Sequence, residues 1–368
     1  MIVDRRLLAH FDWPLLTALG LLSLLGLLMI YSATYDPATG QAGPQVLRQL
    51  VALVIGFAAL AACLAFDYRA LIERSALLYG GLLAALALTL VAGVEQGGAQ
   101  RWLNLGVATI QPSEFARVVL ALVLAMLLVR SRYRQRTTGD WVLACVVVAI
   151  PVLMIMQQPD LGTAATLLPV GLAMALMAGM RFRVLGALAV VAILAAPVVW
   201  AYGLEDYQRT RVASFLDPER DPRGAGYQQI QARITVGAGG LTGRGFLQGT
   251  QSQYNFVPAA HTDFIFSVLA EEHGFLGVVF ALGLYLFVIL RSLQAARVSE
   301  DRLGVLLVAG IMAGFTFQVV YNVTMSAGLL PVKGLTLPLL SYGRSSVIAT
   351  LIGFGLILNV RMYRFSKY

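Results

Sequence analysis

Long runs of apolar residues, each about 17–25 residues in length, recur along this chain and constrain its fold more than any other feature. Such a run crosses the core of a bilayer as a helix, because every backbone amide is then bonded within the segment. Hydrophobic residues make up 58% of the 368 residues, more than a soluble protein could cover with polar surface. The runs are continuous, without the period-two alternation of a transmembrane β-barrel. The sequence therefore predicts an all-α, polytopic integral membrane protein.

We expect about ten transmembrane helices, packed into a single membrane domain over residues 1–368. The expected spans are 15–34, 46–66, 76–94, 113–130, 141–156, 162–180, 184–202, 264–291, 304–327 and 346–361. Between the seventh and eighth spans lies the one large segment outside the membrane, residues 203–262. A loop of this length in a compact protein usually has a function.

Arginine and lysine residues are distributed unevenly between the loops, and this distribution sets the expected orientation. The net charge is +8, from 27 Lys and Arg against 19 Asp and Glu. With the N-terminus inside, sixteen basic residues fall in the inside segments and only five in the short outside segments. Both termini are therefore expected in the cytoplasm, and the long loop outside. Because the basic residues lie between spans instead of on one face, no nucleic acid is expected as a partner.

The densest group of polar residues lies at 258–274, between the long loop and an apolar run. The chain is only 12% charged, yet this stretch contains, among others, His261, Thr262, Asp263, Glu271 and Glu272. Ionisable groups at such a position are energetically unfavourable in a membrane protein and therefore indicate a function. We expect Asp263 at a helix start, where the helix dipole lowers its pKa and burial raises it. Glu271 and Glu272 lie about 12 Å deeper, where pairing with arginines or tuning of the pKa is expected.

The loop at 95–112 also brings polar side chains to the outer side. It carries Arg101 and Trp102 and leads into Glu114 and Arg117, which lie one helical turn apart. An interfacial salt bridge beside a membrane-belt tryptophan and a substrate site are equally compatible with this pattern. Both interpretations stay open at this point.

Two further outer segments carry charge. Asp160 precedes a span, where it is expected to cap the helix, with a carboxylate facing an internal cavity as the alternative. The segment 328–345 is apolar, is broken by prolines and glycines, and carries Lys333. Non-helical backbone at membrane depth must be buried in protein or line a cavity, so this segment should fold back into the bundle.

Two parts of the long loop have recognisable patterns. Residues 227–236 place Tyr227, Ile230 and Ile234 on one side of a short amphipathic helix, which is expected to lie on the membrane surface. Residues 237–245 are rich in glycine, which favours a flexible loop and leaves backbone binding of a phosphate as the alternative.

Eight short motifs extend over nearly the whole chain. They are G-A-Q-R-W-L-N-L-G at 98–106, Q-P-S-E at 111–114, Q-P-D-L-G-T at 158–163, D-P-x-G-A-G-Y at 221–227, G-x-G-G-L-x-G-x-G at 237–245, G-T-Q-S-Q at 249–253, H-T-D-F-I-F-S-V-L-A-E-E at 261–272 and L-P-L-L-S-Y-G at 337–343. In these motifs the chain resembles the SEDS family, named for shape, elongation, division and sporulation. The G-T-Q-S-Q element is similar to the elongation members and not to the division members.

This resemblance implies a peptidoglycan glycosyltransferase that polymerises lipid II into β-1,4-linked strands on the outer face of the inner membrane during cell elongation. It implies that Asp263 is the catalytic base of an inverting reaction that releases undecaprenyl pyrophosphate. Glu114 matches a functionally important acidic position of the family, and Arg101 and Trp102 match the R-W pair that precedes it. Cations, either arginines or a divalent metal such as Mg²⁺ or Mn²⁺, are expected to stabilise the departing charge.

The expected site and partners follow from the same resemblance. The substrate-binding residues are expected to be Glu114, Arg117, Arg101, Trp102, Asp160, Lys333, Ser341 and Arg344. The residues expected to shape the site or tune its pKa are His261, Thr262, Glu271 and Glu272. The expected partners are lipid II, a class B penicillin-binding protein transpeptidase and other membrane proteins of the elongation complex.

Two positions depart from the family pattern. Arg117 stands where the family usually has Lys, and Arg344 where it usually has Gly. An arginine at position 344 would be strained if the backbone there had a positive φ.

Two other functions compete with the glycosyltransferase, a lipid II flippase and a membrane scaffold for a transpeptidase. A transporter needs a polar pathway open to both sides, whereas the cytoplasmic half of the expected bundle has few charges inside the membrane. A scaffold does not readily account for Glu114, Asp160 and Glu271 at the edges of spans. The sequence therefore favours the enzyme.

Overall fold

The long helices match the expected spans. The structure is a computed structural model that describes residues 11–37, 39–96, 99–104, 106, 109–130, 138–198, 200–201, 206–217, 224, 226–254 and 256–363. Its long helices are α2 (Trp13–Ala33), α3 (Gln45–Ala65), α5 (Ser75–Ala92), α6 (Ala116–Arg130), α7 (Thr138–Met156), α8 (Leu161–Met177), α9 (Phe182–Val198), α13 (Ile265–Val298), α14 (Arg302–Ser326) and α15 (Arg344–Met362). Among the described residues, eight helices are long and apolar enough to cross a membrane, and α8 and α9 are shorter apolar helices. The prediction of a polytopic helical membrane protein is confirmed.

Short elements join these helices. They are α4 (Tyr68–Glu73), the 3-10 helix η1 (Pro112–Phe115), α10 (Asp206–Leu216), α11 (Tyr227–Ala238), α12 (Thr250–Gln253), and the strands β1 (Tyr35–Asp36), β2 (Gln41–Ala42), β3 (Val94–Gln96), β4 (Ala99–Asn104) and β5 (Thr109–Ile110). The strands form two small antiparallel sheets, β1-β2 and β3-β4-β5. Trp102 pairs with Val94 and Leu103 with Ile110. The small sheets were not predicted, and the larger one places Arg101 and Trp102 on its central strand.

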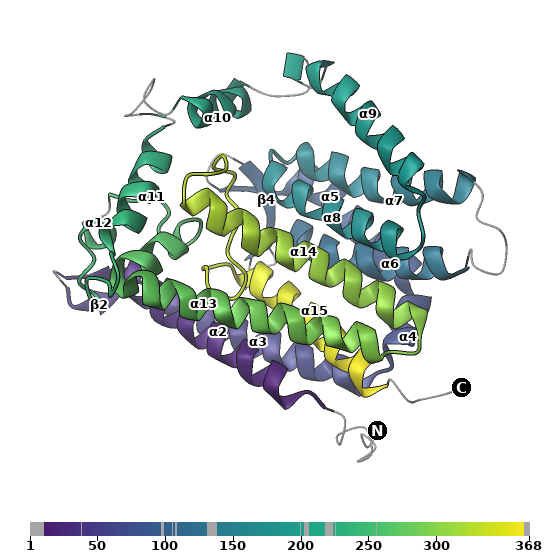
Figure 1. Ribbon diagram of the computed structural model, residues 1–368, viewed down its shortest axis with the longest axis horizontal. Helices are drawn as coiled ribbons and strands as arrows, with labels where there is room; N and C mark the ends of the chain where they lie inside the picture. The colour runs from purple at the N-terminus through teal and green to yellow at the C-terminus, as the bar shows by residue number, and fades with distance from the viewer. Residues whose placement is uncertain are drawn as a thin grey trace.

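The bundle has two different ends (Figure 1). At the terminal end, where the chain enters α2 and leaves α15, the Asp12 carboxylate accepts hydrogen bonds from Arg291 Nε at 3.0 Å and from Arg361. At the opposite, loop end lie the small sheets, α11 and α12. The contact between Asp12 and Arg361 brings the two described ends of the chain together on one side of the bundle, as an even number of spans requires.

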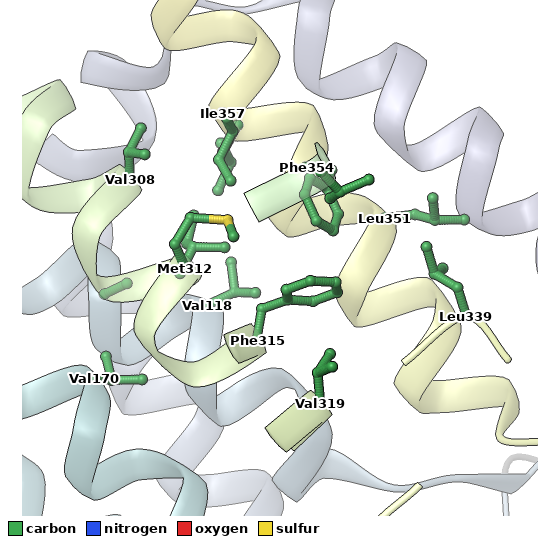
Figure 2. Close-up of a cluster of buried hydrophobic side chains, with 14 of the residues drawn as sticks. Val118, Val170, Val308, Met312, Phe315, Val319, Leu339, Leu351, Phe354 and Ile357 are labelled. Carbon is green, nitrogen blue, oxygen red and sulfur yellow. The ribbon is translucent and has the colours of Figure 1, made fainter. Parts of the chain in front are cut away.

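The core lies around α14, which packs against α6, α8, α13 and α15. Figure 2 shows its centre, where Phe315 of α14 meets Phe354 of α15 between Val118, Val170 and Leu351. The two rings stand edge to face, with centroids 5.0 Å apart and an interplanar angle of 85°. Along α14, Phe315 stands between Arg302 at the terminal end and Gln318 toward the loop end, so this apolar layer lies between the two ends of the bundle.

The re-entrant segment, residues 328–343, folds back into the bundle at the loop end as predicted. Its backbone carbonyls accept hydrogen bonds from buried side chains. Tyr285 Oη donates to Pro338 O at 2.6 Å, and Gln49 Nε2 donates to Ser341 O at 3.1 Å. These bonds allow irregular backbone to exist at membrane depth. A Cβ atom at Gly26 of α2 would lie 2.2 Å from Leu339 O, so only glycine permits the close approach of this segment.

The glycines at 237–245 dock the long loop onto a break in α13. Gly274 interrupts that helix with φ 62° and ψ −162°. A Cβ atom at Gly243 would lie 2.1 Å from Glu272 O, and Gly245 N donates to the same oxygen at 2.9 Å. Arg244 N donates to Glu271 O at 2.9 Å. The glycines therefore serve close packing here, in place of the flexible loop or phosphate cradle that their number suggested.

Helix α11 forms where the sequence predicted a short amphipathic helix. Its buried residues are Gln229, Ala232 and Thr235, and this small, polar face packs against α13. Ile234, which was expected to anchor the helix, is 46% exposed. An apolar side chain that stays exposed is compatible with a helix that lies on the membrane surface, so that expectation stays a prediction.

Candidate active site

A cavity of about 820 Å³ opens at the loop end of the bundle. Its wall is formed by η1, β4, α10, the turn before α13, the re-entrant segment and the start of α15. The charged residues that line it are the carboxylates Glu114, Asp160 and Asp263 and the cations Arg48, Arg101, Arg211, Lys333 and Arg344. The volume lies in the range of small-molecule sites, and the excess of cations suits an anionic ligand.

Asp263 lies in the turn that precedes α13, two residues before the first helical residue. Its backbone N–H donates to Ala259 O at 3.1 Å, and its carbonyl accepts a hydrogen bond from Asn322 Nδ2 at 2.8 Å. Gly334 faces the carboxylate, because a Cβ there would lie 3.6 Å from Asp263 Oδ2. Gly334 has φ 68°, a left-handed conformation that favours glycine. The wall opposite the carboxylate is therefore free of side chain at this point.

Burial raises the pKa of Asp263 to about 6. A hydrogen bond from Thr262 and the charges of Arg211 and Arg101 act in the opposite direction, and the charge of Asp160 adds to the increase. The carboxylate is partly exposed toward the cavity, but protein surrounds it on its other sides and removes most of its water. Burial therefore outweighs the helix dipole. A pKa near ambient pH is the property that a general base requires.

Asp160 fulfils both roles considered for it. Its carboxylate caps α8 by accepting hydrogen bonds from Thr163 N at 3.1 Å and Thr163 Oγ1 at 2.9 Å. Gln111 Nε2 donates to it at 3.0 Å, and Arg101 Nη1 lies 3.9 Å away. The carboxylate also lines the cavity, where its oxygens are already engaged by the protein.

Arg101 extends from β4 to the turn before α8. Its Nε donates to Gln158 O at 3.2 Å, and its Nη2 donates to Pro159 O. The small sheet thus holds the Asp160 turn in place, while Arg101 and Trp102 both line the cavity. Arg101 and Trp102 are therefore part of the candidate site, and Arg101 also connects β4 to the turn before α8.

Glu114 lines the cavity from η1, but two predicted substrate-binding residues lie behind its wall. Arg117 is buried, with Nη2 3.3 Å from Glu114 Oε2, and it donates a hydrogen bond to Gln318 Oε1. Ser341 is buried, and its Oγ accepts a hydrogen bond from Leu337 N at 2.8 Å. The structure therefore corrects the expected contact of Arg117 and Ser341 with substrate, because both bind protein groups.

The remaining cations line the cavity with few protein partners. The Lys333 ammonium lies 5.6 Å from the centroid of the Tyr321 ring, and burial lowers its pKa. Arg344 Nη2 donates to Thr109 Oγ1 at 2.6 Å. Arg344 is the first residue of α15, and Gly343 before it is extended with φ −179°, so the strain considered for this arginine does not occur.

His261 and Thr262 shape the wall next to Asp263. The rings of His261 and Tyr342 lie 5.7 Å apart, and Tyr342 N donates to His261 O at 2.9 Å. Burial lowers the pKa of His261, which keeps the imidazole neutral near pH 7. The turn is thereby joined to the end of the re-entrant segment.

Glu271 and Glu272 do not line the cavity. Glu271 caps α12, since it accepts hydrogen bonds from Gln251 N at 2.7 Å and Ser252 N at 3.1 Å. Glu272 accepts a hydrogen bond from Ser32 Oγ of α2. The expected pairing of these carboxylates with arginines was therefore wrong. They also give no support to a metal ion shared with Asp263.

Several residues of the site were not predicted from the sequence. Arg48, Gln111 and Arg211 line the cavity, and Arg211 Nη1 donates to Val332 O at 3.4 Å. Gln318 and Asn322 lie behind the wall and hold it in place. Two buried amides within an apolar span are a signal that could have been used, because polar groups inside a membrane usually have partners. Arg211 had no distinguishing signal among the other charges of the long loop.

Comparisons with known proteins agree with this architecture. Residues 12–366 match the model of the FtsW/RodA/SpoVE cell cycle proteins. The chain is 37% identical over 346 residues to the peptidoglycan glycosyltransferase MrdB of Escherichia coli strain K12, a match that covers 94% of this chain and 93% of that protein.

Two solved structures share the fold over nearly the full length. A chain from a peptidoglycan synthase complex that coordinates polymerization and crosslinking is 36% identical, with a TM-score of 0.83 and coverage of 97% of this chain and 99% of that one. The rod shape determining protein RodA of Thermus thermophilus is 32% identical, with a TM-score of 0.72 and coverage of 97% and 98%. This chain therefore belongs to the FtsW/RodA/SpoVE family of cell cycle proteins, the SEDS family that its motifs resemble.

Proposed function

We propose that this chain is a peptidoglycan glycosyltransferase that polymerises lipid II into β-1,4-linked glycan strands during cell elongation. The relative from Escherichia coli bears the name of this activity. The observation that carries the proposal is Asp263, a cavity carboxylate of raised pKa surrounded by cations. This arrangement combines a general base with a binding site for an anionic leaving group.

In the proposed reaction Asp263 accepts the proton of the 4-hydroxyl of the acceptor N-acetylglucosamine. The oxygen attacks C1 of the donor N-acetylmuramic acid from the face opposite its pyrophosphate. The new C1–O bond forms as the bond to the pyrophosphate oxygen breaks, and its electron pair leaves with undecaprenyl pyrophosphate. The anomeric centre inverts to the β configuration, and Asp263 then releases its proton to water.

Asp263 suits the role of base better than the other cavity carboxylates. Asp160 accepts hydrogen bonds from Thr163 and Gln111. Glu114 accepts hydrogen bonds from Arg117 and Ser346. A carboxylate whose oxygens already accept hydrogen bonds from protein donors has fewer positions left to accept one from a substrate hydroxyl. Asp263 therefore has the carboxylate most available to an acceptor hydroxyl.

The cations near Asp263 supply the charge that the leaving pyrophosphate requires. Arg101, Arg211 and Lys333 line the same part of the wall, and Arg48 and Arg344 extend it toward α3 and α15. Within the described residues no three His, Cys, Asp or Glu side chains are grouped to hold a metal ion. We assign the leaving charge to these cations, and our mechanism includes no step through Mg²⁺ or Mn²⁺, which stay a prediction from the family resemblance.

We place the protein in the inner membrane with the loop end outside and both termini in the cytoplasm. The distribution of Arg and Lys among the loops supports this orientation. As partners we propose a class B penicillin-binding protein transpeptidase and other elongation proteins. The similar chain from a complex that joins polymerization to crosslinking supports the first of these.

The architecture favours an enzyme over a flippase or a scaffold. Figure 2 shows the apolar side chains around Phe315 and Phe354. Along α14, Phe315 stands between Arg302 at the terminal end and Gln318, which lies behind the cavity wall. At the terminal end Asp12 is paired with Arg291, and Asp301 with Arg69. A transporter would need polar groups along a path between the two ends, and this layer interrupts such a path.

The test is polymerisation of labelled lipid II by the purified protein, with and without a class B penicillin-binding protein. We expect glycan chains whose formation resists moenomycin and is lost with Asp263→Ala. Equal amounts of polymer from the Asp263→Ala variant would contradict the assignment of the base. Transbilayer movement of lipid II without polymer would favour the flippase.

A further inference from the structure

Helix α14 presents two buried amide side chains, one turn apart, to the re-entrant segment. Gln318 Nε2 donates to Thr336 O at 2.9 Å, and Asn322 Nδ2 donates to Leu335 O at 2.6 Å. Gln318 is 1% exposed and Asn322 is fully buried. Two consecutive carbonyls of the cavity wall are thus fixed to one face of one helix.

Asn322 also binds the turn that carries the base. The same Nδ2 atom donates to Asp263 O at 2.8 Å, so one NH₂ group joins Asp263 to the segment that contains Lys333 and Gly334. Both hydrogens of this group are used, one on each carbonyl. The two walls of the cavity that face each other at Asp263 are therefore joined behind the cavity by a single side chain.

We propose that Asn322 is a positioning residue of the reaction, which fixes the separation between the Asp263 carboxylate and the wall formed by Lys333 and Gly334. This inference rests on the proposed function. Asn322 does not line the cavity and acts only through Asp263 and the re-entrant segment. Gln318 holds the same re-entrant segment through its hydrogen bond to Thr336 O.

Gln318 connects the same segment to the buried ion pair. Arg117 donates to Gln318 Oε1, which leaves the Gln318 NH₂ group directed at Thr336 O and Thr336 Oγ1. Glu114 orients Arg117 from η1 at 3.3 Å. The ion pair therefore acts on the reaction by holding the segment of Lys333 in place.

A change in the Asn322 bond should alter the environment of the Asp263 carboxylate. The groups facing that carboxylate come from several elements: Thr262 and His261 in its own turn, Arg101 of β4, Asp160 before α8, Arg211 of α10 and Lys333 of the re-entrant segment. If the turn and the segment separate, water enters between them and the carboxylate becomes easier to ionise. The pH dependence of the reaction then reports the position of Asp263.

The chain contains a matched control for this bond at the terminal end. Asn359 of α15 is fully buried, and its Nδ2 donates to Cys63 O at 2.8 Å and Phe66 O at 2.7 Å. It thus makes the same pair of amide-to-carbonyl bonds as Asn322, on the far side of the apolar layer. Asn359→Ser should lower the stability of the fold through the loss of such a bond, without affecting the cavity.

The experiment compares Asn322→Ser with Asn359→Ser in the full-length protein, together with its transpeptidase partner. Serine retains one donor and can bind one carbonyl at most. We expect both variants to melt at lower temperature. Only Asn322→Ser should lower kcat, on the order of 100-fold for a misplacement near 1 Å. Its KM for lipid II should stay within about twofold, and the acid limb of its pH–rate profile should move to lower pH.

Equal kcat values and unchanged pH profiles for the two variants would overturn the inference. If Asn322→Ser does not yield folded protein, Asn322→Gln replaces it, because the longer amide can fill the site but displaces one of the two carbonyls. The Asp263→Asn variant distinguishes a failure of the positioning inference from a failure of the proposed function. Full activity of Asp263→Asn would refute the base itself, whereas an inactive Asp263→Asn with an unimpaired Asn322→Ser refutes only the positioning role.

Discussion

The two ends of the bundle use the same kinds of charged residue in different ways. At the terminal end Asp12 accepts hydrogen bonds from Arg291 and Arg361, and its side chain is fully buried. Asp301 accepts hydrogen bonds from Tyr68 Oη at 2.7 Å and Arg69 Nε at 3.0 Å. Every one of these charges faces another protein group. The carboxylates here hold helices together.

At the loop end Glu114 pairs with Arg117 and Asp160 with Arg101, but Asp263 and Lys333 face a cavity instead of an opposite charge. Asp263 has no carboxylate-to-cation contact within 4.0 Å among the described residues, and Lys333 rests on an aromatic ring. A desolvated charge that lacks an opposite charge from the protein is unfavourable for folding, and such charges are typical of functional sites. The type of residue therefore does not separate structural from functional charge in this family member. What separates them is whether the protein itself satisfies the charge.

The largest expected effect comes from removing the charge at Asp263. Asp263→Asn keeps the shape of the side chain but removes the base, so polymerisation of lipid II should fall by about 10³-fold. The matched change at the terminal end, Asp12→Asn, should lower the melting temperature and leave the turnover of folded protein intact. The measurement is polymer formed per folded molecule. A comparable loss of turnover in both variants would remove the distinction between the ends.

A smaller effect is expected for the cation next to the base. Lys333→Gln should lower kcat/KM by roughly 10- to 100-fold, because the charge of the leaving pyrophosphate loses one partner. Arg69→Gln, which breaks the pair with Asp301, should change stability alone. Steady-state kinetics and thermal melting of both variants test this. If Lys333→Gln is fully active, the leaving group must be stabilised by the arginines instead.

The pH dependence of the wild type gives the next prediction. The pKa of Asp263 is raised to about 6, and the base must be ionised to act. The value of kcat/KM should therefore fall as pH decreases through about 6, approaching a tenfold loss per pH unit below it. This acid limb of the pH–rate profile should be absent from the residual activity of the Asp263→Asn variant. A limb near pH 4 would show that water, and not protein, surrounds the carboxylate.

The smallest effect should appear in the stability of Asp263→Asn. Because folding raises the pKa of Asp263, the folded state binds its proton more tightly, and the ionised group is unfavourable for folding above about pH 6. The Asn variant should therefore melt a few degrees higher than wild type at pH 8. This advantage should shrink as pH falls from about 6 to 4 and disappear below about pH 3, where wild type is protonated in both states. Lower stability of the variant at pH 8 would indicate that Asp263 is satisfied in the way Asp12 is.

The sequence predicted the long helices well, because the thickness of a bilayer imposes one length and one composition on every span. The span expected at 264–291, for example, corresponds to α13, although the break at Gly274 was not foreseen. The small sheets were missed because strands of two to six residues carry no usable periodicity. The fold of a membrane protein is thus easiest to predict where lipid constrains it.

The site was only partly predictable, because the sequence does not show in which direction a side chain points. Asp263 and Asp160 stand out because charges are rare in this chain, and both line the cavity. Arg117 and Ser341 were assigned to substrate, yet they face inward, since the packing of α6, α14 and the re-entrant segment decides their direction. Asn322 was missed because its contact with Asp263 joins residues far apart in sequence, and no local pattern encodes such a contact.

The anchoring of the re-entrant segment has a consequence for the biogenesis of the protein. Its backbone is held by side chains from three helices, through Gln49 of α3, Tyr285 of α13 and Gln318 of α14, and it is followed by α15. A nascent chain that has inserted α3 and α13 still lacks the segment itself and the last two helices beside it. The cavity is therefore completed only after α15, the last of the described helices, has been inserted. A chain that lacks α15 should therefore insert its other helices but lack part of the cavity wall, including Arg344.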